Sequence, residues 1–551
     1  MSAIPPPIAA PLPVAGPERR PRRVRNRIAA LDRAWVAVAV GTVVLLATAG
    51  ATGLFEPTET RFAEIAREMR ASGDAWVPRL NGLPHFHKPP LAYWATVLGF
   101  RALGENSWGA RIPVALATAL GLAAVALAVR RRFAALGCRP GVTVWLLASA
   151  VLPFGLGRAL ATDPYLATAI AGYWALAPSP WALVAIGLGF AIKGPVVLLF
   201  TAAPVLVASA WGRDRRTLRL LGPPVGWALA AAIALPWYLV VSARTPGLLG
   251  YFLGNQIWQR YATTVHGRQG PWWYFIVTML VGFLPWTPLM VAGAARAWRE
   301  RGREESRLLL AWLAVPFVFL SFSGSKLTAY LLPAFPAAAA LSALGWDRAA
   351  GVARVTTVAL LAAMAAFVAL GVPPLVSRAA GLSAAELVMP GRWVATACLL
   401  AAGVLVQRGR AGGAGAMTLA AWIALLVTLA PFQKFIGSPE PLAAVLVENR
   451  RPGEPVVVYE KFNAGLAFYL REPVRLLDVP REDQFADPAT LPRVYATRDS
   501  LVAWAGSRGR VWMLGRKQTV PALADSLGLS WTRVADWRTL SLGFLEPRTP
   551  R

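Results

Sequence analysis

Long apolar stretches alternate with short, arginine-rich connections along most of the chain. The stretches are roughly 15 to 22 residues long, which is the length that an α-helix needs to cross a hydrocarbon core of ~30 Å. We therefore predict a polytopic α-helical membrane protein with about thirteen transmembrane helices. The predicted spans are residues 34–53, 109–129, 141–158, 164–178, 180–192, 195–211, 221–243, 273–296, 308–322, 328–345, 354–372, 393–407 and 416–433.

The arginine clusters fall in alternate connections, and such clusters face the cytoplasm in membrane proteins. The N-terminus is then expected in the cytoplasm and the C-terminus outside. The outer side receives the chain after residue 433 together with the connections 54–108, 158–163, 244–272 and 323–326.

The pattern changes after residue 433. Helix-like runs such as PLAAVLVENR and VPALADSLG alternate with strand-like runs at 456–459, 474–477, 494–496 and 511–514. This alternation predicts a small extracytoplasmic α/β domain. The predicted organisation is a basic cytoplasmic tail, a transmembrane domain and this outer domain, at residues 1–33, 34–433 and 434–551.

Composition and charge agree with a membrane protein. Hydrophobic residues make up 56% of the 551 residues, and the mean hydropathy is +0.49. The net charge of +28 would suggest nucleic-acid binding in a soluble protein, but much of it is arginine in short loops. The two cysteines, Cys138 and Cys398, lie near or within apolar spans, so they predict neither a disulfide framework nor a metal site.

The first outer connection begins with an expected amphipathic helix at residues 58–69. Its apolar side chains follow the spacing i, i+3, i+4, i+7 from Phe62, and charged side chains occupy the other side. Thr58 is the expected N-cap and Gly73 the expected stop. A helix of this kind, directly after a span, is expected to lie flat at the outer membrane surface.

Three carboxylates on the outer side are candidate catalytic groups. Glu56 and Glu59 lie at the start of the amphipathic helix, where they either cap it or act as a general base or metal ligand. Asp163 begins a span directly after an outer link, where an ionisable group is costly and often functional. The alternative for Asp163 is a helix N-cap before Pro164.

Three of the six lysines, Lys88, Lys193 and Lys326, belong to the transmembrane domain, and all map to its outer side. Lysine is a compact point charge that pairs well with phosphate. Three such cations at one face suggest an anionic lipid headgroup, for example a polyprenyl phosphate. The alternative is ordinary snorkelling of lysine at the membrane interface.

All three histidines of the chain also map to the outer side. His85 and His87 lie in the sequence PHFHKPPLAY of the first outer loop, and His266 lies in the second long outer loop. The three imidazoles are a candidate site for a divalent metal such as Zn²⁺, Mg²⁺ or Mn²⁺. They could equally be hydrogen-bonding loop residues.

The stretch GLFEPTETRFAEIAREMRASGDAWVPRLNGLPHFHKPPLAYW resembles the first extracytoplasmic loop of bacterial GT-C-type glycosyltransferases. The group concerned includes the lipid A aminoarabinose transferase and the protein O-mannosyltransferase-related family 39. ATDPYLA, AIKGP, NQIWQRY, PWWYF and SGSKLTAYLLPAFPA support the resemblance by their order, so that it covers roughly residues 30 to 345.

This resemblance implies an inverting transferase that takes a sugar from a polyprenyl (undecaprenyl) phosphate at the outer face of the bacterial cytoplasmic membrane. The acceptor would be a lipid or a protein or glycan. An acidic residue of the first loop would be the base, and Asp163 a second active-site carboxylate. Lys88, Arg260 and Tyr330 would lie near the donor phosphate.

Two departures from the family pattern concern the site. The aminoarabinose transferases have Pro-Asp-Glu-Thr-Arg where this chain has Pro-Thr-Glu-Thr-Arg, so Thr58 replaces the first acidic residue and the base would be Glu59 or Glu56. The residue before the loop lysine is typically a metal-site glutamate in those enzymes, and here it is His87. The implied metal site is therefore His87 with His266, aided by His85.

The expected chemistry needs a carboxylate to deprotonate the acceptor and cations to stabilise the departing phosphate. Glu56, Glu59 or Asp163 would supply the first, and Lys88, Arg260, Lys193 and Lys326 the second. The sequence has no Asp-x-Asp motif or glycine-rich nucleotide loop, which argues against a nucleotide-sugar donor. The alternatives are a flippase or transporter of lipid-linked sugars, an oligosaccharide polymerase or ligase, and a non-catalytic scaffold.

Overall fold

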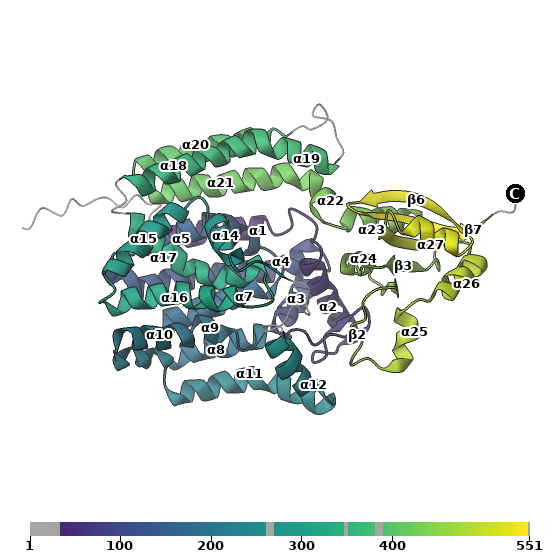
Figure 1. Ribbon diagram of the computed structural model, residues 1–551, viewed down its shortest axis with the longest axis horizontal. Coiled ribbons are helices and arrows are strands. Elements are labelled where there is room, and N and C mark those ends of the chain that lie inside the picture. The colour runs from purple at the N-terminus through teal and green to yellow at the C-terminus, as the bar shows by residue number, and fades with distance from the viewer. Residues whose placement is uncertain (1–32, 260–268, 347–350, 381–388, 549–551) are drawn as a thin grey trace, which may run out of the picture.

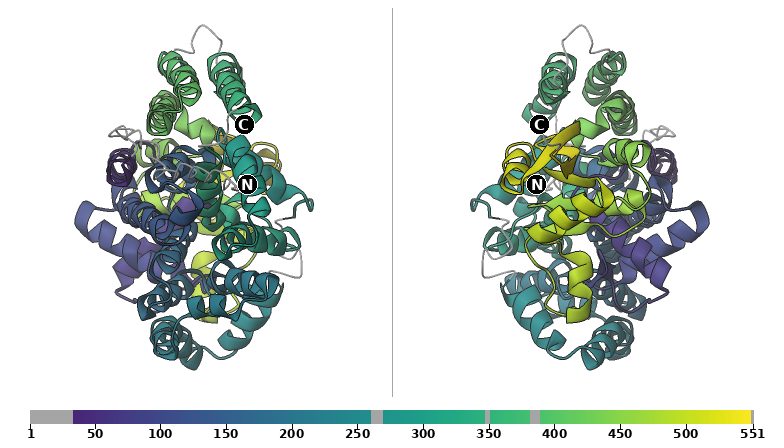
Figure 2. Two further views of the ribbon diagram at one scale, coloured as in Figure 1. Left: turned by 90° about the vertical axis from the view of Figure 1, so that its left-hand side faces the viewer. Right: turned by 90° about the vertical axis from the view of Figure 1, so that its right-hand side faces the viewer.

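Helices that run along the long axis of the molecule form its larger part, and a small α/β domain lies at one end (Figure 1). The computed structural model describes residues 33–259, 269–346, 351–380 and 389–548. Figure 2 shows many of these helices end-on, with α18 and α20 in an outlying layer. The predicted arrangement, a large helical part followed by a C-terminal α/β domain, is confirmed.

The helical part begins with α1 and continues to α22. Labels with η mark short 3-10 or π-helical segments. The elements of the first half are α1 (Ala34–Ala47), α2 (Thr58–Ser72), α3 (Leu91–Leu103), α4 (Ser107–Ala128), η2 (Val129–Phe133), η3 (Ala134–Leu136), α5 (Pro140–Ser149), α6 (Val151–Leu156), α7 (Thr162–Leu176), α8 (Pro180–Lys193), α9 (Val197–Phe200), α10 (Ala202–Gly212), η4 (Arg215–Leu221), α11 (Pro224–Arg244), α12 (Leu248–Gly250) and η5 (Tyr251–Gln259). The second half contains α14 (Tyr274–Gly282), α15 (Thr287–Arg299), α16 (Glu304–Ser321), η6 (Thr328–Ala334), α17 (Phe335–Trp346), α18 (Val352–Ala366), η7 (Phe367–Gly371), α19 (Val372–Ala380), α20 (Gly391–Gln407), α21 (Ala411–Leu429), η8 (Ala430–Phe432) and α22 (Gln433–Ile436).

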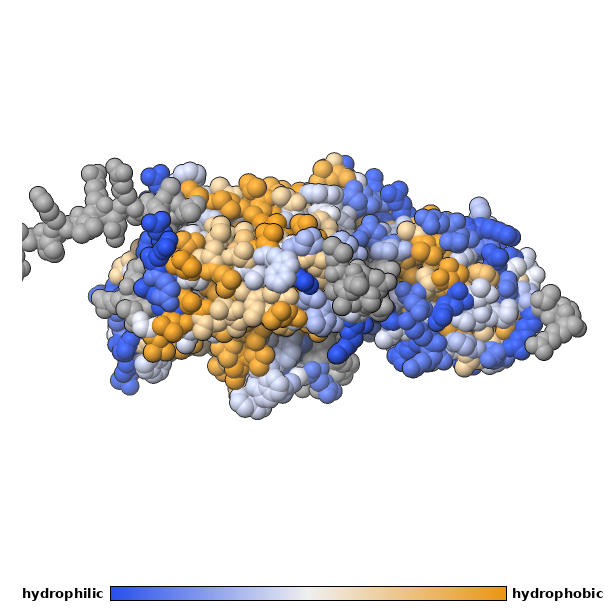
Figure 3. Space-filling view, turned by 90° about the horizontal axis from the view of Figure 1, so that it is seen from above, coloured by the Kyte–Doolittle hydropathy of each residue, from blue (hydrophilic) through white to orange (hydrophobic). Residues whose placement is uncertain are grey.

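Five helices among the described residues are long and apolar enough to cross a membrane, and a bent pair, α14 with α15, adds a sixth if it counts as one span. Six further apolar helices are shorter, at 10–17 residues. On the face shown in Figure 3, hydrophobic residues gather over the helical part and hydrophilic residues over the C-terminal domain. The count of thirteen spans therefore remains a prediction.

Several predicted spans are broken rather than straight. The predicted span 273–296 consists of α14 and α15, which meet at 110°, and Pro285 lies in the break. The predicted span 195–211 breaks at Thr201, where Pro204 has no N–H to offer the carbonyl of Phe200. The predicted span 141–158 breaks at Ala150, between α5 and α6.

The C-terminal domain is built on one mixed sheet with the strand order β4-β3-β5-β7-β6. The first three of these strands are parallel, and β7 and β6 are antiparallel to their neighbours. Every residue of β3 is buried, as expected for a strand covered on both faces. The elements are α23 (Glu440–Asn449), β3 (Val456–Tyr459), α24 (Ala464–Leu470), β4 (Arg475–Leu477), η9 (Pro488–Thr490), α25 (Leu491–Val494), α26 (Arg498–Arg508), β5 (Val511–Arg516), α27 (Val520–Ser526), β6 (Leu529–Trp537) and β7 (Leu540–Pro547).

Three of the four predicted strands are confirmed as β3, β4 and β5. The strand predicted at 494–496 is wrong, because a helical turn, α25, occupies Leu491–Val494. Pro492 lies in the first turn of that helix, where its fixed φ favours a helix start, and only Tyr495 bridges to Leu476 of the sheet.

Helix α2 extends the predicted amphipathic helix to Ser72 and ends at Gly73, whose φ of 71° is the left-handed stop that the sequence predicted. The predicted N-cap is wrong by one position, because Pro57 precedes the first turn. The charged side of this helix, which the sequence pattern places opposite the apolar side, is largely covered. Glu64, Arg67 and Glu68 are buried, because α24 of the C-terminal domain packs against α2.

A short hairpin fixes the first outer loop to the C-terminal domain. Strands β1 (Arg79–Leu80) and β2 (Leu83–Pro84) are joined by Asn81 and Gly82, which both have left-handed backbones, at φ 56° and 83°. The buried amide of Asn81 donates to the carbonyl of Val474 at 2.8 Å and accepts from its N–H at 2.9 Å. The side chain of Asn81 thus makes the two backbone hydrogen bonds with Val474 that a neighbouring strand would otherwise make, and it joins the hairpin to the C-terminal domain.

We predict that Asn81→Ala destabilises the protein by about 2–4 kcal/mol, because two buried backbone groups lose their partners at about 1–3 kcal/mol each. Thermal unfolding in detergent measures the effect. The control is Asn449→Ala, which removes an exposed amide from the same domain and should change stability by about 0.5 kcal/mol or less. Equal melting temperatures for the two variants would contradict the proposed docking role.

Candidate active site

Glu59 and Arg111 form a buried ion pair under the first outer loop. The carboxylate of Glu59 accepts from Arg111 at 2.7 and 2.6 Å, from the N–H of Leu160 at 2.8 Å and from the N–H of Phe55 at 3.0 Å. Burial acts to raise the pKa of Glu59, but Arg111 and the two backbone donors outweigh it and hold the pKa below its ordinary value. With four donors on it, Glu59 is an anchored anion.

Arg111 connects this carboxylate to the outer end of the first helix. Its guanidinium also donates to the carbonyls of Ala49, Thr52 and Gly53, at 2.7–3.0 Å. The side chain is 2% exposed and projects from α4. An arginine within an apolar span is energetically costly unless it is paired, so its presence predicts a buried partner. That signal could have pointed to Arg111 in the sequence, but the prediction missed it.

Glu56 has a different environment. One of its carboxylate oxygens accepts from the N–H of Gly465 at 2.6 Å, in the first turn of α24. Burial raises the pKa of Glu56, and this raising exceeds the opposing effects of that hydrogen bond and of the charges on Arg61 and Lys461. A carboxylate with a raised pKa is closer to the range in which a general base works at neutral pH.

Asp163, Lys193 and Tyr330, three predicted site residues from three separate elements, lie together. The ammonium of Lys193, at the end of α8, forms an ion pair with Asp163 in the first turn of α7. The same ammonium lies 4.6 Å from the centre of the Tyr330 ring. The N-cap alternative for Asp163 is wrong, because α7 begins after Ala161 and no side chain caps it.

Lys326 is a buried cation in the link before η6. Its ammonium donates to the carbonyl of Ser323 at 2.5 Å. In the part of the chain that the structure describes, it forms no ion pair with a carboxylate. An ammonium group has three N–H donors, so one that donates to a single carbonyl can still bind an anion.

The PHFHK segment presents its histidines on one side and is anchored on the other. Phe86 packs into an aromatic cluster with Trp237 and Phe485, with ring centroids 6.5 and 5.8 Å away. The rings of His85 and His87 lie next to each other, with centroids 4.0 Å apart. The half-buried Lys88 follows them.

Glu482 of the C-terminal domain completes a possible metal-ligand set with His85 and His87. Its carboxylate lies 3.5 Å from Nδ1 of His85, and one ligand atom from each of the three residues lies within 4.8 Å of the others. Burial, with Arg61 and Lys88 nearby, lowers the pKa of His85 to about 3, so the imidazole is neutral at pH 7. The sequence could not point to Glu482, because nothing in a linear pattern indicates which outer-domain loop reaches this hairpin.

Two predicted site residues, Arg260 and His266, lie outside the described residues. Their predicted roles stay predictions.

A sequence profile of the dolichyl-phosphate-mannose-protein mannosyltransferase family matches residues 87–240. Undecaprenyl phosphate-alpha-4-amino-4-deoxy-L-arabinose arabinosyl transferase of Edwardsiella ictaluri is 33% identical over 309 residues, which cover 53% of this chain and 55% of that protein. A second relative of the same name, from Sodalis glossinidius, is 35% identical over 314 residues, with the same coverage. The match thus spans about half the length of these relatives.

The crystal structure of ArnT from Cupriavidus metallidurans bound to undecaprenyl phosphate has a TM-score of 0.74 and 26% sequence identity to this chain. The alignment covers 93% of this chain and 97% of that one. The predicted resemblance to GT-C-type glycosyltransferases is confirmed. The ArnT apo structure matches equally well, at a TM-score of 0.76. The fold of this chain, helical membrane part and C-terminal sheet domain included, is therefore the ArnT-like GT-C fold.

We predict that Glu59→Gln and Arg111→Met each cost about 3–5 kcal/mol of stability, because each leaves one buried polar partner uncompensated. The double variant should cost less than the sum of the two, since neither charge is then left unpaired. Denaturation in detergent measures the cycle, and strict additivity would contradict the pairing. The control is Arg70→Met, which breaks a partly exposed pair with Glu105 and should cost about 1 kcal/mol or less.

The same pair predicts a pH dependence of stability. The pKa of Glu59 is lower in the folded protein than its ordinary 4.5, so its contribution is complete above pH 4.5 and is lost as the pH falls below that value. Glu59→Gln should flatten this acid limb of the stability curve. An unchanged limb in the variant would show that other carboxylates carry it.

Proposed function

We propose that the protein is an inverting glycosyltransferase that moves a sugar from a polyprenyl (undecaprenyl) phosphate to a lipid, protein or glycan acceptor outside the cytoplasmic membrane. The observation that carries the proposal is the Asp163–Lys193–Tyr330 cluster, which joins carboxylate, cation and aromatic ring from separate helices. The likeness to ArnT, whose solved structure holds undecaprenyl phosphate, supports this donor class.

In the proposed reaction, a carboxylate removes the proton from an acceptor hydroxyl. The acceptor oxygen then forms a bond to the anomeric carbon while the bond from that carbon to the phosphate oxygen breaks, with inversion. The polyprenyl phosphate leaves with the bonding electrons, and nearby cations stabilise its charge. Lys88, Lys193 and Lys326 are the proposed cations, with Arg260 and Tyr330 assigned to the same phosphate by resemblance to the family.

Glu56 is our choice for the base. Glu59 is bound by four donors and Asp163 is paired with Lys193, so the oxygens of both carboxylates are already engaged by fixed partners. Glu56 has a raised pKa, and it lies in the first outer loop where that loop contacts the outer domain. A cavity of about 250 Å³ is lined by Pro57, the residue after Glu56, and by Arg61 and Lys461, and it offers space for the headgroup of the acceptor.

The proposed sidedness follows the arginine pattern of the loops. The N-terminus is cytoplasmic, thirteen spans cross the inner membrane, and the active site and C-terminal domain face the periplasm or the cell exterior. The carboxylates and cations of the site gather on links assigned to the outer side, which supports this orientation.

We predict that Glu56→Gln lowers the rate of sugar transfer by about 10²–10⁴-fold, the usual contribution of a general base. The assay follows radiolabelled sugar from a polyprenyl-phosphate donor to extracted acceptors in proteoliposomes. Because the pKa of Glu56 is raised, the wild-type rate should increase with pH through an inflection above 4.5.

Thr58→Ala is the matched control, since it changes the exposed neighbour at the position where relatives carry an acid, and it should transfer at close to the wild-type rate. Full activity of Glu56→Gln would refute Glu56 as the base. If the wild-type protein releases no sugar from the lipid but moves the lipid between leaflets, it is a flippase and the transferase proposal fails.

We also propose that His85, His87 and Glu482 hold a divalent metal, with His266 as a further ligand. Two imidazoles and a carboxylate suit Zn²⁺ better than Mg²⁺, which prefers oxygen ligands. Such an ion would supply a fixed positive charge between the first outer loop and the outer domain. The spacing of the three ligand atoms supports the proposal.

Metal analysis of the purified protein tests the site. We predict about one equivalent of zinc in the wild type, and its loss from the double variant His85→Ala/His87→Ala. Glu482→Ala should also lose the metal, whereas its control Glu472→Ala, which changes a half-buried glutamate elsewhere in the outer domain, should retain it. Equal zinc content in all variants would rule out this ligand set.

A further inference from the structure

Arg158 is a buried arginine that forms no ion pair among the residues that the structure describes. It lies in the outer turn between α6 and α7, and its side chain is 7% exposed. Within the described part of the chain, its guanidinium forms no hydrogen bond and no ion pair. The recorded contact of its charge is with the ring of Phe154, 5.9 Å from the guanidinium carbon to the ring centre.

The charges around Arg158 do not neutralise it. Arg111 and Glu59 are the charged groups that act on it, and Glu59 is already bound by Arg111 and two backbone donors. Burial, and then Arg111, lowers the pKa of Arg158 to about 10, so the guanidinium is charged at pH 7. The three groups together carry one positive charge in a buried place, which is costly unless an anion binds there.

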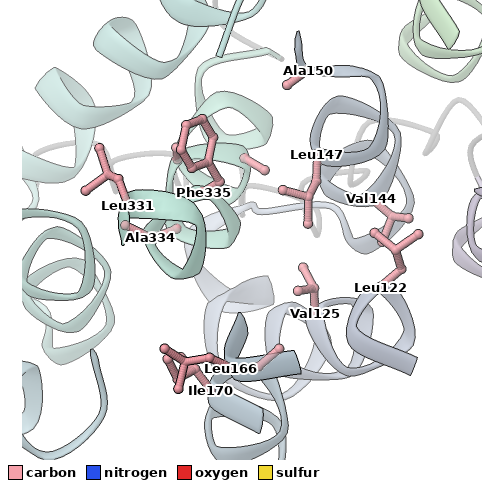
Figure 4. Close-up of a cluster of buried hydrophobic side chains, with 14 of the residues drawn as sticks. Leu122, Val125, Val144, Leu147, Ala150, Leu166, Ile170, Leu331, Ala334 and Phe335 are labelled. Atoms are coloured by element: carbon pink, nitrogen blue, oxygen red, sulfur yellow. The ribbon is translucent and has the colours of Figure 1, made fainter. Parts of the chain in front are cut away.

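Phe154, the ring over which the Arg158 guanidinium lies, also lines an apolar cavity. A cavity of about 70 Å³ lies between α1, α4, α5 and α7, and Phe154 and Gly157, just before Arg158, are part of its wall. In Figure 4, Val125 and Leu147 point toward this space from opposite sides. A cation next to an apolar cavity among membrane helices suits a ligand with an anionic head and a hydrocarbon tail.

We propose that Arg158 binds the phosphate of the polyprenyl carrier. The inference rests on the proposed function and adds a residue to its phosphate site. A guanidinium offers a planar fork of N–H donors that matches two phosphate oxygens. The negative charge of the phosphate would balance the positive charge of Arg158, which no carboxylate among the described residues does. The turn that carries Arg158 leads into α7, whose first turn holds Asp163 of the Asp163–Lys193 pair.

The test combines stability and binding in the purified full-length protein. If Arg158 is an uncompensated charge, Arg158→Met removes the cost of its burial and raises the melting temperature of the ligand-free protein. The same variant binds undecaprenyl phosphate about tenfold to hundredfold more weakly than wild type, measured by the ligand-induced rise in melting temperature. Arg158→Lys retains the charge and therefore part of that rise.

Undecaprenol, which has the same chain and no phosphate, should produce equal small shifts in wild type and Arg158→Met. Arg215→Met, on the cytoplasmic side by our assignment and exposed, is the control and should bind like wild type. A lower melting temperature of ligand-free Arg158→Met would overturn the inference, because it would make Arg158 a structural residue. Equal affinity of wild type and Arg158→Met for undecaprenyl phosphate would overturn it as well.

The outcomes separate this inference from the proposed function. If wild type shows no shift with undecaprenyl phosphate, the donor class itself is wrong and the assignment of Arg158 fails with it. If wild type shifts and Arg158→Met shifts equally, only the role of Arg158 is wrong. An equal Arg158-dependent shift with phosphatidylglycerol would overturn the assignment to the polyprenyl carrier.

Discussion

The buried ion pair between Glu59 and Arg111 holds together the face of the protein that we assign to the outside. Arg111 belongs to a membrane helix, and Glu59 to the helix that follows the first span. Through its remaining donors Arg111 also fixes the carbonyls at the end of the first span, and through Leu160 the carboxylate fixes the turn that leads to Asp163. One buried pair thereby sets the relative positions of three segments that supply candidate site residues.

Contacts with the outer domain also fix the position of the first outer loop. Asn81 bonds both backbone groups of Val474, and Glu56 bonds the first turn of α24. The first outer loop is therefore held between the membrane helices and the α/β domain. This arrangement leaves Glu56 half-buried and without the arginine hydrogen bonds that Glu59 receives, so the pKa of Glu56 is raised and the pKa of Glu59 is lowered.

The cations of the outer face divide into two kinds. Lys193 has a carboxylate partner, while Lys326 and Arg158 are buried and form no ion pair among the described residues. Uncompensated buried charge is unfavourable in a folded protein, and the anionic ligand that we propose would compensate it on both links. A lipid phosphate fits the membrane position of both links.

Sequence reasoning succeeded where the pattern is local. Apolar runs of spanning length predicted the membrane class, Gly73 predicted the end of α2, and alternating runs predicted β3, β4 and β5. It failed where tertiary packing decides: the charged side of α2 is covered by a domain hundreds of residues later in the chain, and Pro285 and Pro204 break stretches that composition alone joins. Arg111 and Glu482 acquire their partners only through the fold.

The position of bound phosphate tests this account most directly. A cryo-EM structure of the protein in lipid nanodiscs with undecaprenyl phosphate should show the phosphate at the outer face, within hydrogen-bonding distance of Lys88, Lys193, Lys326 or Arg158. Phosphate density at the cytoplasmic, arginine-rich end of the helices, with those four side chains unchanged, would contradict it.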